Sequence, residues 1–168
     1  MAVFQDKLYV GVANKTEGAQ IWRFDGMHWL QVNRSGFGSR DNKAIAAMTA
    51  TKTALYASTA SRECGEVWQF NGKDWACIHS GAFGNTKVKT VNSMAVFKNK
   101  LYIGLWDQVT SKPAEVWAYD GTAHWQQVNT PGFGSAHNLN VTGLFVSKVS
   151  GTERLYAIGD NSLRTPKT

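Results

Sequence analysis

The residues best suited to chemistry in this 168-residue chain are aromatic side chains in loops, and the chemistry they suit is ligand stacking. Trp106 stands directly before Asp107, so an indole face and a carboxylate are available to the same ligand. Phe37, Phe83 and Phe133 each precede a glycine in a long polar segment. An exposed aromatic face packs against a sugar ring or a similar small molecule, while neighbouring polar groups fix its orientation.

Polar side chains in the same segments complete the predicted site. Asn42, Asn138 and Arg40 offer amide and guanidinium groups that hydrogen-bond to hydroxyl groups. The predicted ligand-binding residues are therefore Trp106, Asp107, Phe37, Phe83, Phe133, Asn42, Asn138 and Arg40. The alternative interpretation is structural: the three phenylalanines pack between neighbouring parts of the fold, and the asparagines cap turns.

The sequence pattern carries no catalytic signature. The four histidines lack the spacing of a metal site, and so do the two cysteines, Cys64 and Cys77. There is no Ser/His/Asp order with a local signature, no phosphate-binding loop and no zinc motif. We therefore predict that the protein is not an enzyme and that it uses no metal and no cofactor.

Charge and hydropathy narrow the choice of partner. Lys and Arg number 18 and Asp and Glu number 12, which gives a net charge of +6. The basic residues are spread along the chain, which favours ordinary solubility over a nucleic-acid interface. No apolar run approaches the roughly 20 residues of a membrane-spanning helix. We expect neither a nucleic acid nor a membrane as partner.

The elements that must position these residues are repeats of one unit. The stretch Met1–Gly11, MAVFQDKLYVG, returns at Met94–Gly104 as MAVFKNKLYIG. A Leu-Tyr pair recurs in steps of 47, 46 and 54 residues, beginning at Leu8, Leu55, Leu101 and Leu155. A period near 47 residues is typical of β-propeller blades and also of helical repeats.

Secondary-structure signals favour strands. Each unit has four short runs rich in aliphatic, β-branched and aromatic residues, and no segment keeps a helical apolar period. The predicted strands are 1–4, 8–12, 20–24, 29–32, 44–50, 55–58, 66–70, 75–78, 91–97, 101–105, 115–119, 125–128, 141–147 and 154–158. Between the third and fourth runs, Asp-Gly or Asn-Gly supplies the positive φ of a tight turn, at Asp25-Gly26, Asn71-Gly72 and Asp120-Gly121.

Four antiparallel strands per unit, repeated in series, predict an all-β fold of the β-propeller class. The units are about 1–43, 44–90 and 91–140, followed by a partial unit at 141–160 and a C-terminal tail at 161–168. This is about three and a half four-stranded blades, whereas propellers close with about four to eight. We therefore expect a partial ring, completed by oligomerisation or by sequence beyond that shown.

A four-stranded meander places its connections alternately at two ends. The loops after the second and fourth strands share one end, and the hairpins after the first and third strands share the other. Long loops tend to carry function, whereas short turns carry shape. The predicted ligand-binding residues all fall in the long loops, so they are expected at one end of the molecule.

The chain resembles kelch-like propeller repeats of bacterial and archaeal proteins, most of which are uncharacterised. The resemblance rests on three consecutive patterns: MAVFxxKLY(V/I)G, then (E/Q)(V/I)Wx(F/Y)(D/N)GxxW, then GFG. It extends to about Asp160 and implies a β-propeller fold, but it implies no activity. The Trp-Asp signature of WD40 blades and the paired glycines of true kelch blades are absent.

Two functions fit this sequence best. The first is a non-catalytic, lectin-like binding module that recognises a carbohydrate or other ligand through its long-loop end. The alternative is a scaffold without a small-molecule ligand, whose copies self-assemble into a closed ring or which joins the remainder of a larger propeller. A weaker alternative is a glycan-active hydrolase or lyase. Met1–Phe4 runs into repeat sequence rather than into a signal peptide, and the compartment is left open, extracellular and cell-surface locations included.

Overall fold

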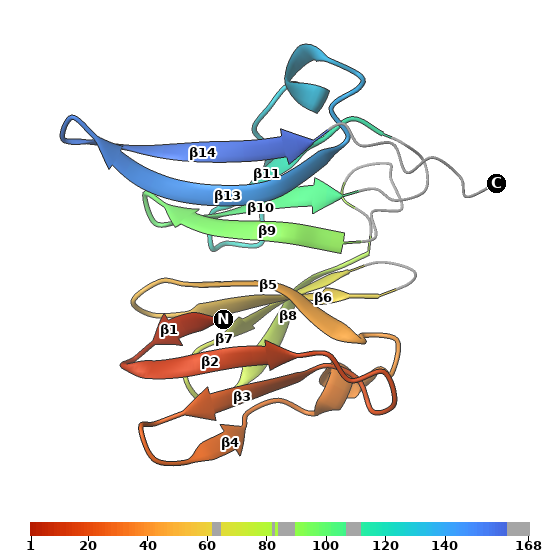
Figure 1. The fold of residues 1–168 in the computed structure, drawn as a ribbon, viewed down its shortest axis with the longest axis vertical. Coiled ribbons are helices and arrows are strands. Elements are labelled where there is room, and N and C mark those ends of the chain that lie inside the picture. The colour runs from red at the N-terminus through yellow and green to blue at the C-terminus, as the bar shows by residue number, and fades with distance from the viewer. Residues whose placement is uncertain (62–64, 82, 84–89, 107–111, 161–168) are drawn as a thin grey trace.

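A computed structural model describes residues 1–61, 65–81, 83, 90–106 and 112–160 of the chain. Within these residues the fold is all-β, with fourteen strands and two short 3-10 turns. The strands form a series of antiparallel meanders stacked in chain order, from β1–β4 at the bottom of Figure 1 to β13 and β14 at the top. The predicted tail at 161–168 lies outside the described residues.

The strands follow one another in four groups, which we call units 1 to 4. Unit 1 holds β1 (Ala2–Phe4), β2 (Lys7–Val12), β3 (Gln20–Phe24) and β4 (Trp29–Gln31). Unit 2 holds β5 (Ala44–Ala50), β6 (Leu55–Ala60), β7 (Glu66–Phe70) and β8 (Trp75–Ser80). Unit 3 holds β9 (Thr90–Phe97), β10 (Lys100–Trp106), β11 (Val116–Tyr119) and β12 (Trp125–Gln127). Unit 4 holds β13 (Asn140–Val149) and β14 (Thr152–Asp160).

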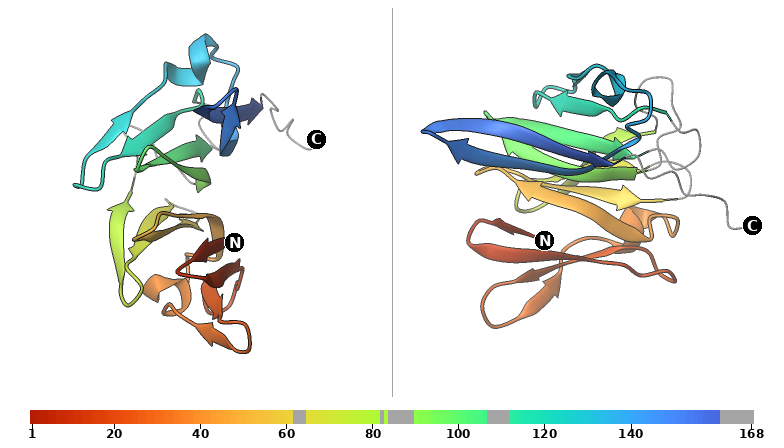
Figure 2. Two further views of the ribbon diagram at one scale, coloured as in Figure 1. Left: turned by 90° about the vertical axis from the view of Figure 1, so that its left-hand side faces the viewer. Right: turned by 45° about the horizontal axis from the view of Figure 1, so that its top comes forward.

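Consecutive strands pair within each unit, and single residue pairs join unit 2 to unit 3 and unit 3 to unit 4. Ala60 of β6 pairs with Thr90 of β9, and Trp106 of β10 pairs with Asn140 of β13. Units 2, 3 and 4 therefore form one curled antiparallel sheet, while unit 1 is a separate four-stranded sheet. The turned views in Figure 2 show the units following one another along the molecule. This arrangement is compatible with part of a β-propeller.

The strand predictions are confirmed, with ends that shift by no more than two residues. The Asp-Gly turns form as predicted, since Gly26, Gly72 and Gly121 all have positive φ. The side chain of the preceding residue holds each turn. Asp25 Oδ1, for example, accepts hydrogen bonds from the backbone N–H groups of Met27 and His28, both at 2.9 Å.

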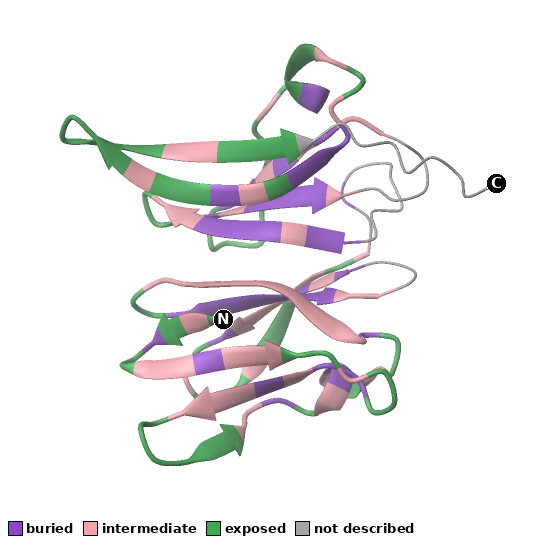
Figure 3. Ribbon diagram, viewed as in Figure 1, coloured by how far each residue is buried: buried purple, intermediate pink, exposed green. Residues whose placement is uncertain are grey.

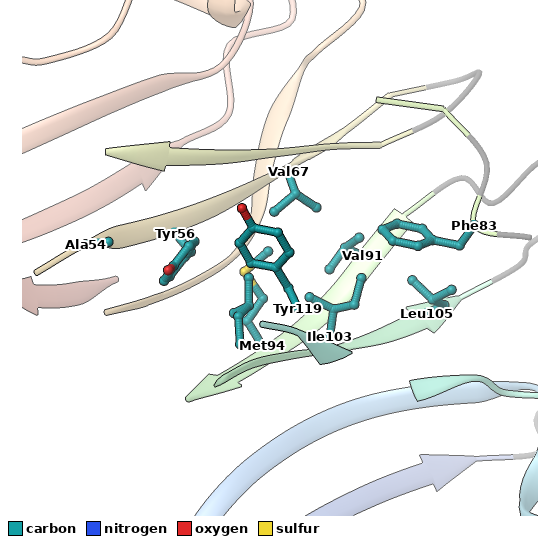
Figure 4. Close-up of a cluster of buried hydrophobic side chains, with 10 residues drawn as sticks. Ala54, Tyr56, Val67, Phe83, Val91, Met94, Ile103, Leu105 and Tyr119 are labelled. Atoms are coloured by element: carbon teal, nitrogen blue, oxygen red, sulfur yellow. The ribbon is translucent and has the colours of Figure 1, made fainter. Parts of the chain in front are cut away.

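The hydrophobic core consists of three clusters, each at a junction between two units. Phe4 and Tyr9 of unit 1 pack with Leu55 and Phe70 of unit 2. The same arrangement recurs between units 2 and 3, where Tyr56 and Val67 meet Ile103, Leu105 and Tyr119 (Figure 4). The third cluster joins unit 3 to unit 4 through residues that include Val116, Val141 and Leu144.

Two glycines permit the close approach of one unit to the next. A Cβ added to Gly11 would lie 2.5 Å from Cβ of Ile45, and a Cβ added to Gly104 would lie 2.5 Å from Cγ1 of Val141. Both contacts are far shorter than van der Waals separation, so the first strand of the following unit could not pack there against a larger residue. Burial is deepest in β6, β9 and β10, whereas β4, β8 and β12 contain no buried residue (Figure 3).

Candidate functional site

The Phe-Gly motif forms a tight turn that directs the phenylalanine toward the next unit. In unit 1 the turn is the 3-10 segment Ser35–Gly38, in which Gly36 and Phe37 have φ of 59° and 54°. The segment Pro131–Gly134 repeats this geometry in unit 3, with a φ of 54° at Phe133. Positive φ is costly for a phenylalanine, so the surrounding structure must hold the residue in place.

The Phe37 ring packs against two tryptophans of unit 2. It stacks on Trp68 with ring centroids 4.4 Å apart and an interplanar angle of 11°. It also meets the edge of Trp75 at 5.2 Å. The Nε1 atom of Trp75 donates a hydrogen bond of 2.9 Å to the carbonyl oxygen of Val32, which ties the two units together. Phe37 therefore acts as the packing interpretation of the sequence expects.

Phe83 occupies the same place at the junction of units 2 and 3. Only 2% of its surface is exposed. Its ring packs against Trp117 and Trp125 of unit 3, with centroids 5.6 and 5.1 Å away, and stacks on His79 at 3.7 Å. Two of the three predicted aromatic slots are thus closed by tryptophans of the following unit.

Phe133 differs from its two counterparts. Its surface is 52% exposed, and no aromatic ring among the described residues packs on it. With Asn138, Asn140, Ala157 and Gly159 it lines a cavity of about 210 Å³ beside unit 4. The structure thus brings together two of the predicted ligand-binding residues, Phe133 and Asn138, in one cavity.

Asn42 joins unit 1 to unit 2 through a buried hydrogen-bond network. Its side-chain amide donates to the carbonyl oxygen of Gly36 at 2.9 Å and to Oε2 of Glu66 at 2.8 Å. Its Oδ1 accepts a hydrogen bond of 2.8 Å from the hydroxyl of Thr59, and that hydroxyl accepts from the backbone N–H of Glu66 at 3.0 Å. Asn42 is 2% exposed, so its amide makes hydrogen bonds within the protein and is not accessible to a ligand.

Asn138 is the counterpart of Asn42 in unit 3 and keeps one part of that network. Its side-chain amide donates to the carbonyl oxygen of Gly132 at 2.9 Å. Gly159 stands where unit 2 has Thr59, so this position supplies no hydroxyl to the Oδ1 atom. Among the described residues, no carboxylate takes the place of Glu66 beside Asn138.

Trp106 lies at the end of β10 rather than in a free loop. It pairs with Asn140 of β13, and the equivalent positions in the other units are Ala13 and Ala60. Its side chain is half-buried. Asp107 lies outside the described residues, and Arg40 is exposed in the turn that precedes Asn42. Trp106 and Arg40 therefore do not line the cavity formed by Phe133 and Asn138.

A second cavity, of about 910 Å³, lies between units 2 and 3 at the short-turn end. Tyr56, Gln69, Asn99 and residues of the turn at 51–53 line it. Burial raises the pKa of Tyr56, and the nearby Tyr119 adds to that shift. The phenol of Tyr56 is therefore neutral at pH 7, as a tyrosine at its ordinary pKa also is. Sequence reasoning assigned this end to structural turns and did not single out these residues.

The described residues contain no group of three His, Cys, Asp or Glu side chains that could hold a metal ion. They also contain no helix long and apolar enough to cross a membrane. Comparison with protein-family models gave no match, and a search of curated proteins gave none either.

Proposed function

We propose that the chain is a β-propeller segment, made of three four-stranded blades and the first two strands of a fourth, and that it functions as a non-catalytic assembly module. Support for the propeller comes from meanders of equal topology that follow one another with a hydrophobic cluster at each junction. The resemblance to kelch-like bacterial and archaeal repeats points the same way.

The observation that carries the assembly proposal is the open face of unit 1. In units 2 and 3 the equivalent face packs on the preceding unit and is buried, as at Leu55 and Leu105, which are 0% and 4% exposed. The equivalent residues of unit 1 are Leu8 and Val12, and Val12 is 40% exposed. Trp29, the counterpart of the half-buried Trp75, is 50% exposed. An apolar face of this kind marks an interaction surface.

Unit 4 offers the complementary face. Phe145 and Tyr156 stack on each other there with ring centroids 5.3 Å apart. Phe145 and Ile158 are 43% and 53% exposed. Contact between the unit 4 face of one copy and the unit 1 face of the next repeats the order of the inner junctions. Such a head-to-tail contact forms a closed ring if the rotation per copy closes.

The mass in solution tests this proposal. The chain has a mass of 18.5 kDa, and we expect light scattering after gel filtration to give a defined multiple of that value. Val3→Lys and Ile158→Lys, one on each open face, should each give the monomer, because a buried unpaired charge opposes association. Met27→Lys, in an exposed turn, is the matched control and should leave the oligomer unchanged. A monomeric wild-type protein at tens of micromolar would overturn the proposal.

Carbohydrate binding by the long-loop end stays a prediction, and a hydrolase or lyase activity stays a weaker one. Of the predicted ligand-binding residues, Phe37, Phe83 and Asn42 are committed to contacts between units. The geometry therefore favours assembly over a repeated ligand slot.

A further inference from the structure

The fourth unit presents an open strand edge beside the cavity at Phe133. In units 1 to 3 the second strand pairs on both sides, with the first strand and with the third. β14 is the second strand of unit 4, and among the described residues its partner is β13. The other edge of β14 therefore offers backbone N–H and C=O groups to an added strand.

The register of an added strand follows from the other units. Leu8, Leu55 and Leu101 of the second strands each pair with an aromatic residue of the third strand, which is Phe24, Phe70 or Tyr119. Leu155 is the corresponding residue of β14. A strand that pairs with β14 in this register places its aromatic residue opposite Leu155, and the tryptophan two positions earlier opposite Ala157.

The cavity lies at the position where the first junction holds a tryptophan and a glutamate. Phe133, Asn138 and Gly159, which line it, correspond to Phe37, Asn42 and Thr59 of the first junction. There the Phe37 ring stacks on the indole of Trp68, and the Asn42 amide donates to the carboxylate of Glu66. Phe133 and Asn138 thus present the same aromatic face and the same amide, without those partners among the described residues.

The sequence Glu-Val-Trp fills this position twice, at 66–68 and at 115–117. In both copies Oε2 of the glutamate accepts a hydrogen bond from the indole Nε1 two residues later, at 2.8 Å in unit 2 and 2.9 Å in unit 3. The indole and the carboxylate are therefore held together as one group. At the first junction that group presents a flat ring to Phe37 and a hydrogen-bond acceptor to Asn42.

A second contact calls for a hairpin rather than a single strand. The carbonyl oxygen of Val32 accepts a hydrogen bond from Trp75, which follows Trp68 by seven residues across the Asn71-Gly72 turn. Val128 is the equivalent of Val32 in unit 3, and its side chain is 46% exposed. A second tryptophan on the outer strand of a hairpin would reach the carbonyl oxygen of Val128 as Trp75 reaches that of Val32. This bond is specific to the first junction among the described residues, since the Nε1 atom of Trp125 has no partner there.

We infer that the edge of β14, together with Phe133, Asn138 and Val128, is a binding site for a β-hairpin with a Glu-Val-Trp strand. The hairpin adds to the sheet beside β14, its first tryptophan stacks on Phe133, and its glutamate accepts from Asn138. Specificity comes from the paired indole and carboxylate, because the backbone pairing alone accepts many sequences. This inference uses the junction geometry and does not require the end-to-end association proposed above.

Binding of a synthetic hairpin to the full chain tests the site directly. The probe is a fluorescent peptide with the sequence of residues 65–81 and Cys77→Ser. Its binding is measured by fluorescence anisotropy, at a concentration of the chain at which light scattering has determined the oligomeric state. We expect saturable binding that Trp68→Ala in the peptide, or Phe133→Ala in the chain, weakens at least about tenfold (about 1.4 kcal/mol), since either change removes the aromatic stack and its buried apolar area. Met27→Ala in the chain is the control and should bind like wild type.

Hydrogen exchange separates the proposed site from a non-specific contact. Peptide binding should slow the exchange of β14 amides while the amides of β4 stay unchanged. No saturable binding, or full affinity of the Trp68→Ala peptide, would overturn the inference. So would peptide binding that slows exchange only in unit 1. A monomeric chain that still binds the hairpin would instead reject the assembly proposal and keep this one.

Discussion

The phenylalanine of the Phe-Gly motif occurs three times in the chain and in two different environments. Phe37 and Phe83 contact two tryptophans of the next unit, whereas Phe133 lines an open cavity. The sequence alone predicted all three equally as ligand contacts or as packing residues. It could not separate them, because the difference depends on the strands of the following unit and not on the motif.

Phe37→Ala and Phe133→Ala form a matched pair for stability. We expect Phe37→Ala to lower the free energy of unfolding by about 2–3 kcal/mol, since it removes a stacked and an edge contact and leaves a cavity. Phe133→Ala should change it by less than about 0.5 kcal/mol, because that ring is half exposed. Urea denaturation measures both. Equal losses for the two variants would contradict the packing role of Phe37.

Asp25 and Asp120 predict an acid-dependent contribution to stability. Backbone hydrogen bonds from His28 and Met27 hold the pKa of Asp25 below its usual value, and hydrogen bonds from Thr122 do the same for Asp120. A pKa lower in the folded state stabilises the fold above the unfolded value of about 3.9, and this is lost as pH falls toward the folded pKa.

Replacement of both residues by asparagine tests that dependence. Asn71 already holds the equivalent turn, since its Oδ1 accepts from the backbone N–H groups of Lys73 and Asp74 at 2.8 Å. Asp25→Asn/Asp120→Asn should therefore melt near the wild-type temperature at pH 7 and lose less stability between about pH 4 and 2. Thermal melts across this range check it, and parallel curves for the two proteins would contradict the assignment.

At the scale of the elements, the strands and the tight turns are the features that the sequence predicted best. Local patterns predict both: short runs rich in β-branched and aromatic residues define strands such as 66–70, and Asp-Gly defines the turn at Asp25. The cavity at Phe133 could not be predicted, because it requires the register of β14 against a neighbouring turn. Aligning Gly159 with Thr59 would have indicated that Asn138 lacks the hydroxyl partner of Asn42.

The glycines at unit junctions predict a sharp dependence on side-chain volume. Gly11→Ala should destabilise the fold by about 1–3 kcal/mol, because the added methyl group meets Cβ of Ile45, an atom fixed to the backbone. Gly143→Ala is the control, since the nearest atoms of Ile158 lie 3.7 Å from the added Cβ. Chemical denaturation compares the two variants. Equal stability would contradict the tight approach of β5 to Gly11.

At the scale of the whole molecule, each hydrophobic cluster takes its side chains from two consecutive units. A single four-stranded meander from this chain therefore has no interior of its own, and the smallest piece that contains one is a pair of neighbours. The free energy of unfolding then comes mainly from the junctions between units and not from the individual sheets. Opening should begin at the outer units, which have one neighbour each, and reach units 2 and 3 last. An insertion within a loop leaves this order intact, whereas a mutation at one junction divides the array into two pieces that open separately.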